Sequence, residues 1–163
     1  AGEYFCHAYG NSMGLETVGL RYFNVFGPRQ DPTSQYSAVI PLFITALMEG
    51  RRPTIYGDGS QTRDFTYVAN NVQANILAAT TTNNVAGKII NIACGKSYTV
   101  LDLLKAINET LGKNIKQIFS PIRKGDVKHS LADISLAREL LDYEVKVDFT
   151  EGIKRTVEWY VNI

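Results

Sequence analysis

The sequence lacks several features that would place it in common functional classes. It has two distant cysteines, Cys6 and Cys94, and its two histidines, His7 and His129, have no Cys or His neighbour at ligand spacing. We therefore expect buried free thiols, a reducing cytoplasmic location and no metal site. A net charge of +1 gives no electrostatic basis for binding nucleic acid or an anionic membrane. No apolar run approaches the roughly 20 residues that a membrane-spanning helix needs.

Catalytic signatures are also missing. None of the 13 glycines forms the Gly-x-Gly-x-x-Gly motif of a dinucleotide-binding turn, because Gly57-Asp58-Gly59 is followed by Ser60-Gln61-Thr62. There is no lysine P-loop and no Ser-His-Asp set. From its residues alone, the chain is better suited to hold a ligand than to transform one.

Strands and helices alternate along the chain, which predicts an α/β fold in one compact unit covering residues 1–163. Apolar patterns and breakers predict strands at 17–23, 53–56, 88–93 and 115–119, and helices at 3–13, 42–48, 68–80 and 100–111, with two more before the C-terminus. No repeat, low-complexity tract or linker interrupts this pattern.

Helix ends and faces can be predicted more closely in places. In helix 68–80 one apolar stripe predicts the face turned to the core: Val68, Val72, Ile76 and Ala79. Thr99 and Asp102 have the spacing of a capping box, with Asp in place of Glu. We expect Asp133 and Thr150 to cap the two C-terminal helices.

The stretch 20–32 is the centre of the pattern. It begins as an apolar strand and stops at Gly27-Pro28, because proline cannot extend a central ladder. Asn24 is left near the C-terminal end of that strand. In open α/β sheets this is the edge where ligands bind.

The string Arg-Tyr-Phe-Asn-Val-Phe-Gly-Pro-Arg-Gln-Asp-Pro, residues 21–32, closely resembles the extended short-chain dehydrogenases that act on nucleotide sugars, and most of all the UDP-sugar 4-epimerases. The resemblance covers essentially the whole chain. It implies the last helix and strands of a Rossmann-like parallel sheet, together with the small α/β substrate-binding domain of that class. It also implies a UDP-sugar substrate, a homodimer and an NAD cofactor, with Tyr22 and Phe23 lining the nicotinamide side.

The resemblance also predicts what precedes the chain. Ala1-Gly2-Glu3 matches the helix just beyond the catalytic Tyr-x-x-x-Lys. We therefore expect the NAD-binding part and the catalytic residues to lie upstream, and the chain alone to be inactive. It would be the C-terminal nucleotide-sugar-binding portion of the enzyme.

Two arginines carry the expected phosphate contacts. Arg63 and Arg123 lie in separate Gly-containing loops, and a guanidinium can donate two parallel hydrogen bonds to a phosphate while staying charged. Surface solubility is the competing interpretation of each. By the resemblance, both match diphosphate-binding arginines, and Asp126 matches the carboxylate that binds the ribose hydroxyls.

Further contacts follow from the same resemblance. Tyr56 matches the aromatic residue that faces uracil, although from the sequence alone it could equally cap the core. Ala38 and Val39 match positions whose backbone bonds the uracil edge, and Asn24 matches the asparagine that holds phosphate oxygens.

Ser130 bears on the choice of sugar. It stands where glucose-restricted members of the family tend to have a bulky tyrosine, so we expect UDP-N-acetylhexosamines to be accepted as well as UDP-hexoses. Alternatively, Ser130 is a turn or N-cap residue. A nucleotide-sugar 4,6-dehydratase, a UDP-glucuronate decarboxylase and a non-catalytic nucleotide-sugar binding module remain alternatives for the function.

Overall fold

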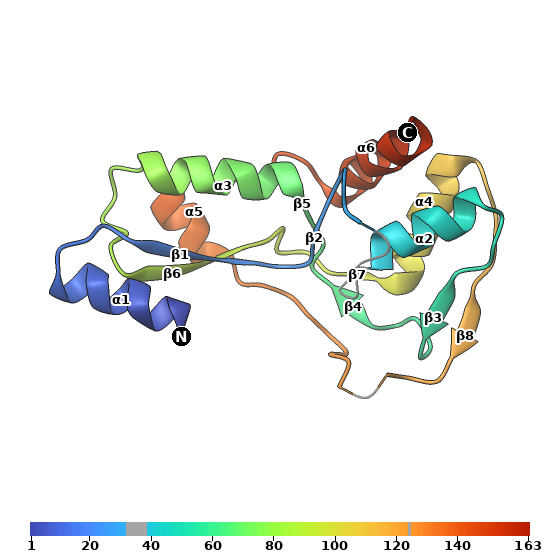
Figure 1. Cartoon of the computed structure of the whole chain (residues 1–163), viewed down its shortest axis with the longest axis horizontal. Coiled ribbons are helices and arrows are strands. Elements are labelled where there is room, and N and C mark those ends of the chain that lie inside the picture. The colour runs from blue at the N-terminus through green and yellow to red at the C-terminus, as the bar shows by residue number, and fades with distance from the viewer. Residues whose placement is uncertain (32–38, 124) are drawn as a thin grey trace.

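The computed structural model of the chain describes residues 1–31, 39–123 and 125–163, which form two lobes side by side (Figure 1). The first lobe contains α1 (Gly2–Ser12), β1 (Val18–Tyr22), α3 (Val68–Thr80), β6 (Lys88–Ile92) and α5 (Ser135–Leu141). The second contains α2 (Val39–Met48), β3 (Thr54–Tyr56), β4 (Thr62–Arg63), β7 (Tyr98–Thr99), α4 (Val100–Leu111), β8 (Ile118–Ser120) and α6 (Phe149–Val161). Between them lie β2 (Val25–Phe26) and β5 (Thr66–Tyr67).

The strands pair two by two. In the first lobe β1 runs parallel to β6, with Leu20 opposite Ile90. In the second lobe β3 pairs with β8 in parallel and β4 pairs with β7 antiparallel. The parallel pair β2 and β5 lies at the junction. The mixture of helices with mainly parallel strands confirms the predicted α/β class. Strand β1 ends at the junction of the two lobes (Figure 1).

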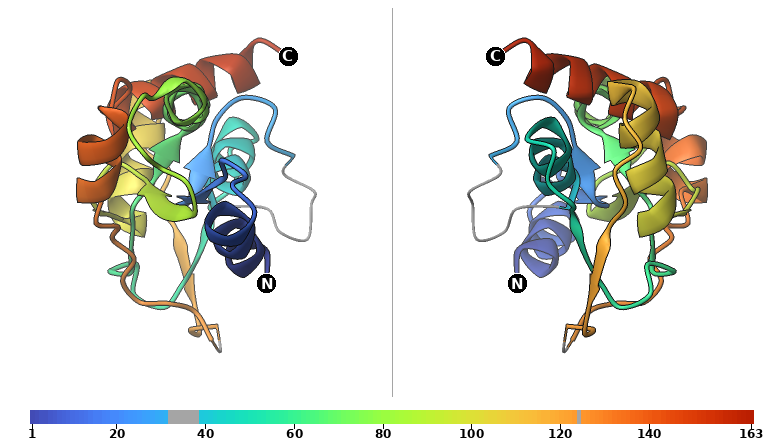
Figure 2. Two further views of the ribbon diagram at one scale, coloured as in Figure 1. Left: turned by 90° about the vertical axis from the view of Figure 1, so that its left-hand side faces the viewer. Right: turned by 90° about the vertical axis from the view of Figure 1, so that its right-hand side faces the viewer.

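Each lobe has its own hydrophobic core. The second lobe buries aromatic residues between α2, α4 and α6, which pack against one another (Figure 2). Within it, the rings of Tyr98 and Phe149 stack with centroids 4.0 Å apart. The first lobe buries aliphatic side chains of β6 with α3 and α5, and the buried Tyr143 hydroxyl donates to the backbone carbonyl of Ala93. These cores fix the strand ends that meet at the junction.

The predicted inward face of α3 is wrong. Its bounds match the expected helix, but Val72 is 54% exposed and Ile76 59% exposed, so the apolar stripe points to solvent. Asn70, Asn71 and Ala74 are buried instead. The reason is a polar tie, because the fully buried Asn70 side chain donates to the carbonyl of Val147 and accepts from its N–H. An amide satisfied in this way can be buried in place of an apolar side chain.

Of the three predicted N-caps, one is confirmed and two differ in the structure. The capping box at Thr99–Asp102 is confirmed, with both reciprocal hydrogen bonds present. The N-cap of α5 is Ile134 rather than Asp133, and that of α6 is Asp148 rather than Thr150, which lies inside the first turn. The strand expected at 115–119 begins only at Ile118. At α6, Asp148 and Thr150 stand two positions apart, so the sequence pattern did not specify which one would cap. At α5, the Asp133 side chain still accepts from the N–H of Ser135, although Ile134 is the N-cap.

Both cysteines are free thiols; Cys94 is buried as expected, whereas Cys6 is partly exposed. Within residues 1–31, 39–123 and 125–163, every helix is too short or too polar to cross a membrane.

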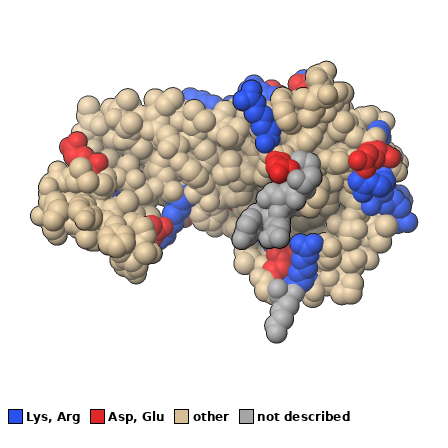
Figure 3. Space-filling model, viewed as in Figure 1, with Lys and Arg blue, Asp and Glu red and all other residues tan. Residues whose placement is uncertain are grey.

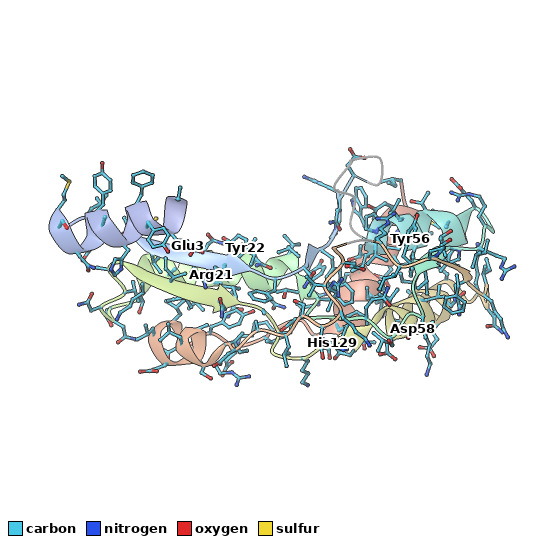
Figure 4. All side chains as sticks on the ribbon, turned by 90° about the horizontal axis from the view of Figure 1, so that it is seen from below. Glu3, Arg21, Tyr22, Tyr56, Asp58 and His129 are labelled. Carbon is cyan, nitrogen blue, oxygen red and sulfur yellow. The ribbon has the colours of Figure 1, made fainter. Side chains whose placement is uncertain are left out.

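Helix α1 packs on β1 and β6 but buries none of its residues. Three of its large side chains are largely exposed: Tyr4 at 82%, Phe5 at 63% and Met13, at its end, at 73%. Seen from below, Glu3 lies beside Arg21 of β1, while none of the described residues packs on the opposite face of the helix (Figure 4). The surface around this lobe carries few charges in the view of Figure 3. The result is an exposed apolar face on α1.

Candidate functional site

A cavity of about 430 Å³ opens in the second lobe, between β3, β4, the start of α2 and the loop after β8. Its volume is in the range of small-molecule sites. Six residues predicted from the sequence line it: Asn24, Val39, Tyr56, Arg63, Arg123 and Asp126. They come from five segments distant in sequence, which the fold brings to one place. Ala38 lies outside the described residues.

Arg63 ends β4 and reaches across the cavity to the loop after β8. Its Nη2 donates to Oδ1 of Asp126 at 2.5 Å, and the side chains are only 17% and 30% exposed. Its Nη1 donates to the backbone carbonyl of Thr62, which steadies the guanidinium. The pairing of β4 with β7 places Arg63 opposite Tyr98 and so anchors its backbone to the core. A cation and a carboxylate therefore share one partly buried position.

Arg123 lies over the ring of Tyr56, with its guanidinium carbon 3.7 Å from the ring centroid. The contact follows from strand pairing, since Tyr56 ends β3 opposite Ser120, three residues before Arg123. A guanidinium on an aromatic face is an attractive cation–π arrangement.

Asn24 follows β1 at the junction of the lobes. Its φ is 34°, in the left-handed region that asparagine tolerates better than most residues. The side-chain amide of Asn24 donates to the backbone carbonyl of Asp64 at 3.2 Å. The backbone carbonyl of Asn24 accepts from the N–H of Thr66. This turn directs the exposed Asn24 side chain toward the same edge as Arg63.

Asp64 was not singled out from the sequence, yet it holds the site's segments together. Its fully buried carboxylate accepts from three backbone N–H groups, those of Cys94, Gly95 and Ala132. Burial raises the pKa of Asp64 above its ordinary value, although the three donors act in the opposite direction. It joins the end of β6, the segment before α5 and Arg63. The only available signal was its position next to Arg63.

Gln61 is a second residue that sequence reasoning missed. It lines the cavity, and its side-chain amide donates to the carbonyl of Tyr56 at 2.7 Å, which links the Gly-containing loop to the end of β3. A polar residue two positions before Arg63 in that loop was the signal that could have identified it.

Three predicted residues lie outside the cavity lining. Tyr22 is 47% exposed, with its hydroxyl bonded to Asn75, and Phe23 is half-buried against the core of the first lobe. Ser130 is partly buried, and its N–H donates to the carbonyl of Thr62, directly before Arg63. Ser130 is thus a neighbour of the cavity wall.

The cavity is suited to binding. Two guanidinium groups, one aromatic ring and one carboxylate can together recognise phosphates, a planar ring and hydroxyl groups. Within the described ranges no group of three or more His, Cys, Asp or Glu side chains could hold a metal ion. The Cys94 thiol is a poor nucleophile, because burial raises its pKa to about 11.

Comparison with known proteins matches the chain to a family. The profile of the NAD dependent epimerase/dehydratase family matches residues 1–93. A UDP-glucose 4-epimerase from Mycolicibacterium smegmatis is 36% identical over 162 residues, which are 99% of this chain and 51% of that protein. A dTDP-glucose 4,6-dehydratase from an Actinoplanes species is 37% identical over 155 residues, 94% of this chain and 46% of that protein.

A solved structure agrees with the fold. The UDP-N-acetylglucosamine 4-epimerase from Methanobrevibacter ruminantium M1, in complex with UDP-N-acetylmuramic acid, superposes with a TM-score of 0.91 at 45% identity. The match covers 98% of this chain and 51% of that one. The chain therefore spans about half the length of the relatives that it matches.

Proposed function

The chain belongs to the NAD dependent epimerase/dehydratase family, and we propose that it is the nucleotide-sugar-binding part of an NAD-dependent UDP-sugar 4-epimerase. The observation that carries the proposal is the convergence of Arg63, Arg123, Tyr56 and Asp126 on one cavity. These side chains suit a nucleoside diphosphate, and they are brought together from the ends of β3 and β4 and from the loop after β8. The relatives named as UDP-sugar 4-epimerases support the choice of substrate class.

Each group has a proposed part in holding the substrate. Arg63 and Arg123 neutralise the diphosphate, since a guanidinium donates paired bonds to phosphate oxygens. Tyr56 provides a face for uracil and Asp126 accepts from ribose hydroxyls. Asn24, at the edge of the same cavity, donates to a phosphate oxygen. The backbone of Ala38 and Val39 would bond the uracil edge, and Val39 lines the cavity as this requires.

The reaction proposed for the complete protein is oxidation at sugar C4, rotation of the 4-keto sugar and reduction on its other face. NAD, when bound, supplies the hydride acceptor and donor. We place Tyr22 and Phe23 on the nicotinamide side; the half-exposed ring of Tyr22 fits a contact with NAD, whereas Phe23 offers only the part of its ring that faces away from the core. This chain's contribution is to hold and orient the nucleotide sugar.

Calorimetric titration of the chain with UDP-N-acetylglucosamine tests the proposal, with Arg63→Ala measured beside it. We expect binding to the parent chain and a loss of affinity in the variant of at least about tenfold, because a buried diphosphate contact is worth more than 1.4 kcal/mol. UDP-glucose provides the comparison for the sugar. Equal affinity in parent and variant would contradict the proposed diphosphate site. Binding by the parent chain that is lost in Arg63→Ala would show that Arg63 contacts the ligand.

A second candidate is a nucleotide-sugar 4,6-dehydratase, which the Actinoplanes relative favours. The two functions share the binding of a nucleoside diphosphate and differ in the chemistry at the sugar. Product analysis of the complete protein, by NMR after incubation with UDP-glucose, distinguishes them: an epimerase returns UDP-galactose, whereas a dehydratase releases water and leaves a 4-keto-6-deoxy sugar.

We also propose that the complete protein is a homodimer.

A further inference from the structure

Both cations of the cavity already have partners within the chain. Arg63 is paired with Asp126 at 2.5 Å, and Arg123 covers one face of Tyr56 at 3.7 Å. The Arg63–Asp126 pair is largely screened from solvent, with side chains 17% and 30% exposed. The four groups that would contact a nucleoside diphosphate are therefore engaged with one another in the free chain.

This pairing has a cost for any ligand that enters. A phosphate that approaches Arg63 meets the carboxylate of Asp126, which repels it unless the carboxylate finds another donor. A base that takes the covered face of Tyr56 must displace the guanidinium of Arg123. A group that loses its partner in a partly buried site without gaining another costs free energy.

We propose that the site selects its ligand by exchange of partners, an inference that rests on the proposed function. Arg63 and Arg123 pass to the diphosphate, Asp126 passes from Arg63 to two vicinal hydroxyls, and Tyr56 passes from Arg123 to the base. Only a ligand that carries diphosphate, diol and base together satisfies all four groups. Pyrophosphate leaves Asp126 without a donor, and a nucleoside leaves Arg123 without a partner. The internal pairs thereby discriminate against fragments of the substrate.

The sharpest consequence concerns Asp126, which is a competitor for pyrophosphate but a ligand for UDP. The Asp126→Asn variant removes the ion pair between Asp126 and Arg63. We expect pyrophosphate to bind about fivefold more tightly than to the parent chain, as the loss of a partly exposed ion pair allows. We expect no gain for UDP, because the same change removes the acceptor of the ribose hydroxyls. The preference for UDP over pyrophosphate should therefore shrink.

A matched control separates exchange from a general gain of positive charge. Asp58 is an exposed carboxylate in the neighbouring loop that lines a hollow together with Asp126, but its oxygen accepts from Ser60 and it is outside the Arg63 pair. Asp58→Asn removes one negative charge from the neighbouring hollow and should change pyrophosphate affinity less than twofold. As a second variant, Tyr56→Leu frees Arg123 and should strengthen pyrophosphate binding about twofold while weakening UDP.

The measurement is calorimetric titration of the parent chain and the three variants with UDP and with pyrophosphate, at one ionic strength. Tighter pyrophosphate binding in Asp126→Asn than in Asp58→Asn, without a gain for UDP, supports the exchange. Equal shifts in the two Asp variants, while the parent binds UDP, would overturn the exchange and leave the proposed function intact. Absence of UDP binding to the parent chain would overturn both. Circular dichroism of each variant checks that it is folded.

Discussion

The side-chain amide of Asn24 donates to the backbone carbonyl of Asp64 at 3.2 Å, although 40 residues separate them. The carboxylate of Asp64 in turn accepts from the N–H groups of Cys94, Gly95 and Ala132. One buried residue thus joins the ends of both strands of the first lobe to the segment that leads into α5. Because Arg63 precedes it, the position of the cavity's main cation depends on this junction.

Asp64→Asn should therefore lower the free energy of unfolding by about 1–3 kcal/mol. In the parent, each of these backbone N–H groups donates to a carboxylate oxygen, whereas in the variant the side-chain NH₂ of asparagine would face at least one of them and leave it without an acceptor. Urea unfolding followed by circular dichroism measures the change. Asp58→Asn is the control, since Asp58 is exposed, and it should stay within about 0.5 kcal/mol of the parent. Equal stability of Asp64→Asn and the parent would show that the three hydrogen bonds are not stabilising.

Much of the fold could be predicted because it depends on local rules. The bounds of α3 and the capping box at Thr99–Asp102 follow from periodicity and short-range hydrogen bonds, and both were found. The outward face of α3 could not, because Asn70 is buried by bonds to Val147, a residue 77 positions away. Helical periodicity reports which side chains share a face, but not which face the rest of the chain covers.

In the candidate site, too, some residues could be predicted from the sequence, whereas others depend on contacts that only the folded chain makes. Six of the predicted contacts line one cavity, and most of them were assigned through resemblance rather than from local physics. Asp64 and Gln61 escaped notice because their roles are bonds to backbone groups that only the folded chain brings near. The Arg63–Asp126 pair joins residues 63 positions apart, so no spacing rule could indicate it.

The capping box gives a pH-dependent prediction. Hydrogen bonds from the hydroxyl and N–H of Thr99 hold the pKa of Asp102 below its ordinary value. A lowered pKa in the folded state means that the contribution is present above the unfolded value and is lost as the pH falls through the folded one. Asp102→Ala should therefore cost about 1 kcal/mol near pH 7.

Urea unfolding of the parent and Asp102→Ala at pH 7 and below pH 3 measures this contribution. The gap in the free energy of unfolding should narrow in acid, because the parent's carboxylate becomes protonated. Thr110→Ala, in the last turn of the same helix, is the control: it removes no carboxylate, so its difference from the parent in the free energy of unfolding should not change with pH. A gap that is constant with pH would contradict the assigned role of the Asp102 carboxylate.

The apolar face of α1 predicts self-association of the chain. Tyr4 and Phe5 are 82% and 63% exposed on a helix that buries none of its own residues. Exposed apolar patches favour association, so the double variant Tyr4→Ser, Phe5→Ser should shift the chain toward monomer in sedimentation velocity experiments at tens of micromolar. Ile163→Ser is the control, because Ile163 is 81% exposed but lies beyond the C-terminal end of α6 rather than on α1. Identical sedimentation of all three proteins would exclude a role for this face.

Ser130 offers the most direct test of substrate breadth. It is partly buried, and its N–H donates to the carbonyl of Thr62, so a side chain grown from its Cβ starts at the wall next to Arg63. In the complete protein, Ser130→Tyr should lower kcat/KM for UDP-N-acetylglucosamine by about tenfold or more, since overpacking a filled site costs roughly 1–3 kcal/mol. UDP-glucose, which lacks the N-acetyl group, should be affected far less.

The two substrates are compared by coupled epimerisation assays on the parent, Ser130→Tyr and Ser130→Ala. The alanine variant keeps the space and removes only the hydroxyl, so it should retain the parent's ratio of activities. If Ser130→Tyr epimerised the N-acetylated substrate at the parent rate, the side chain at this position would not set the size of the C2 substituent. If both substrates lost activity equally, Ser130 would act on the backbone beside Arg63 rather than on the sugar. The selective loss alone supports a specificity role for Ser130.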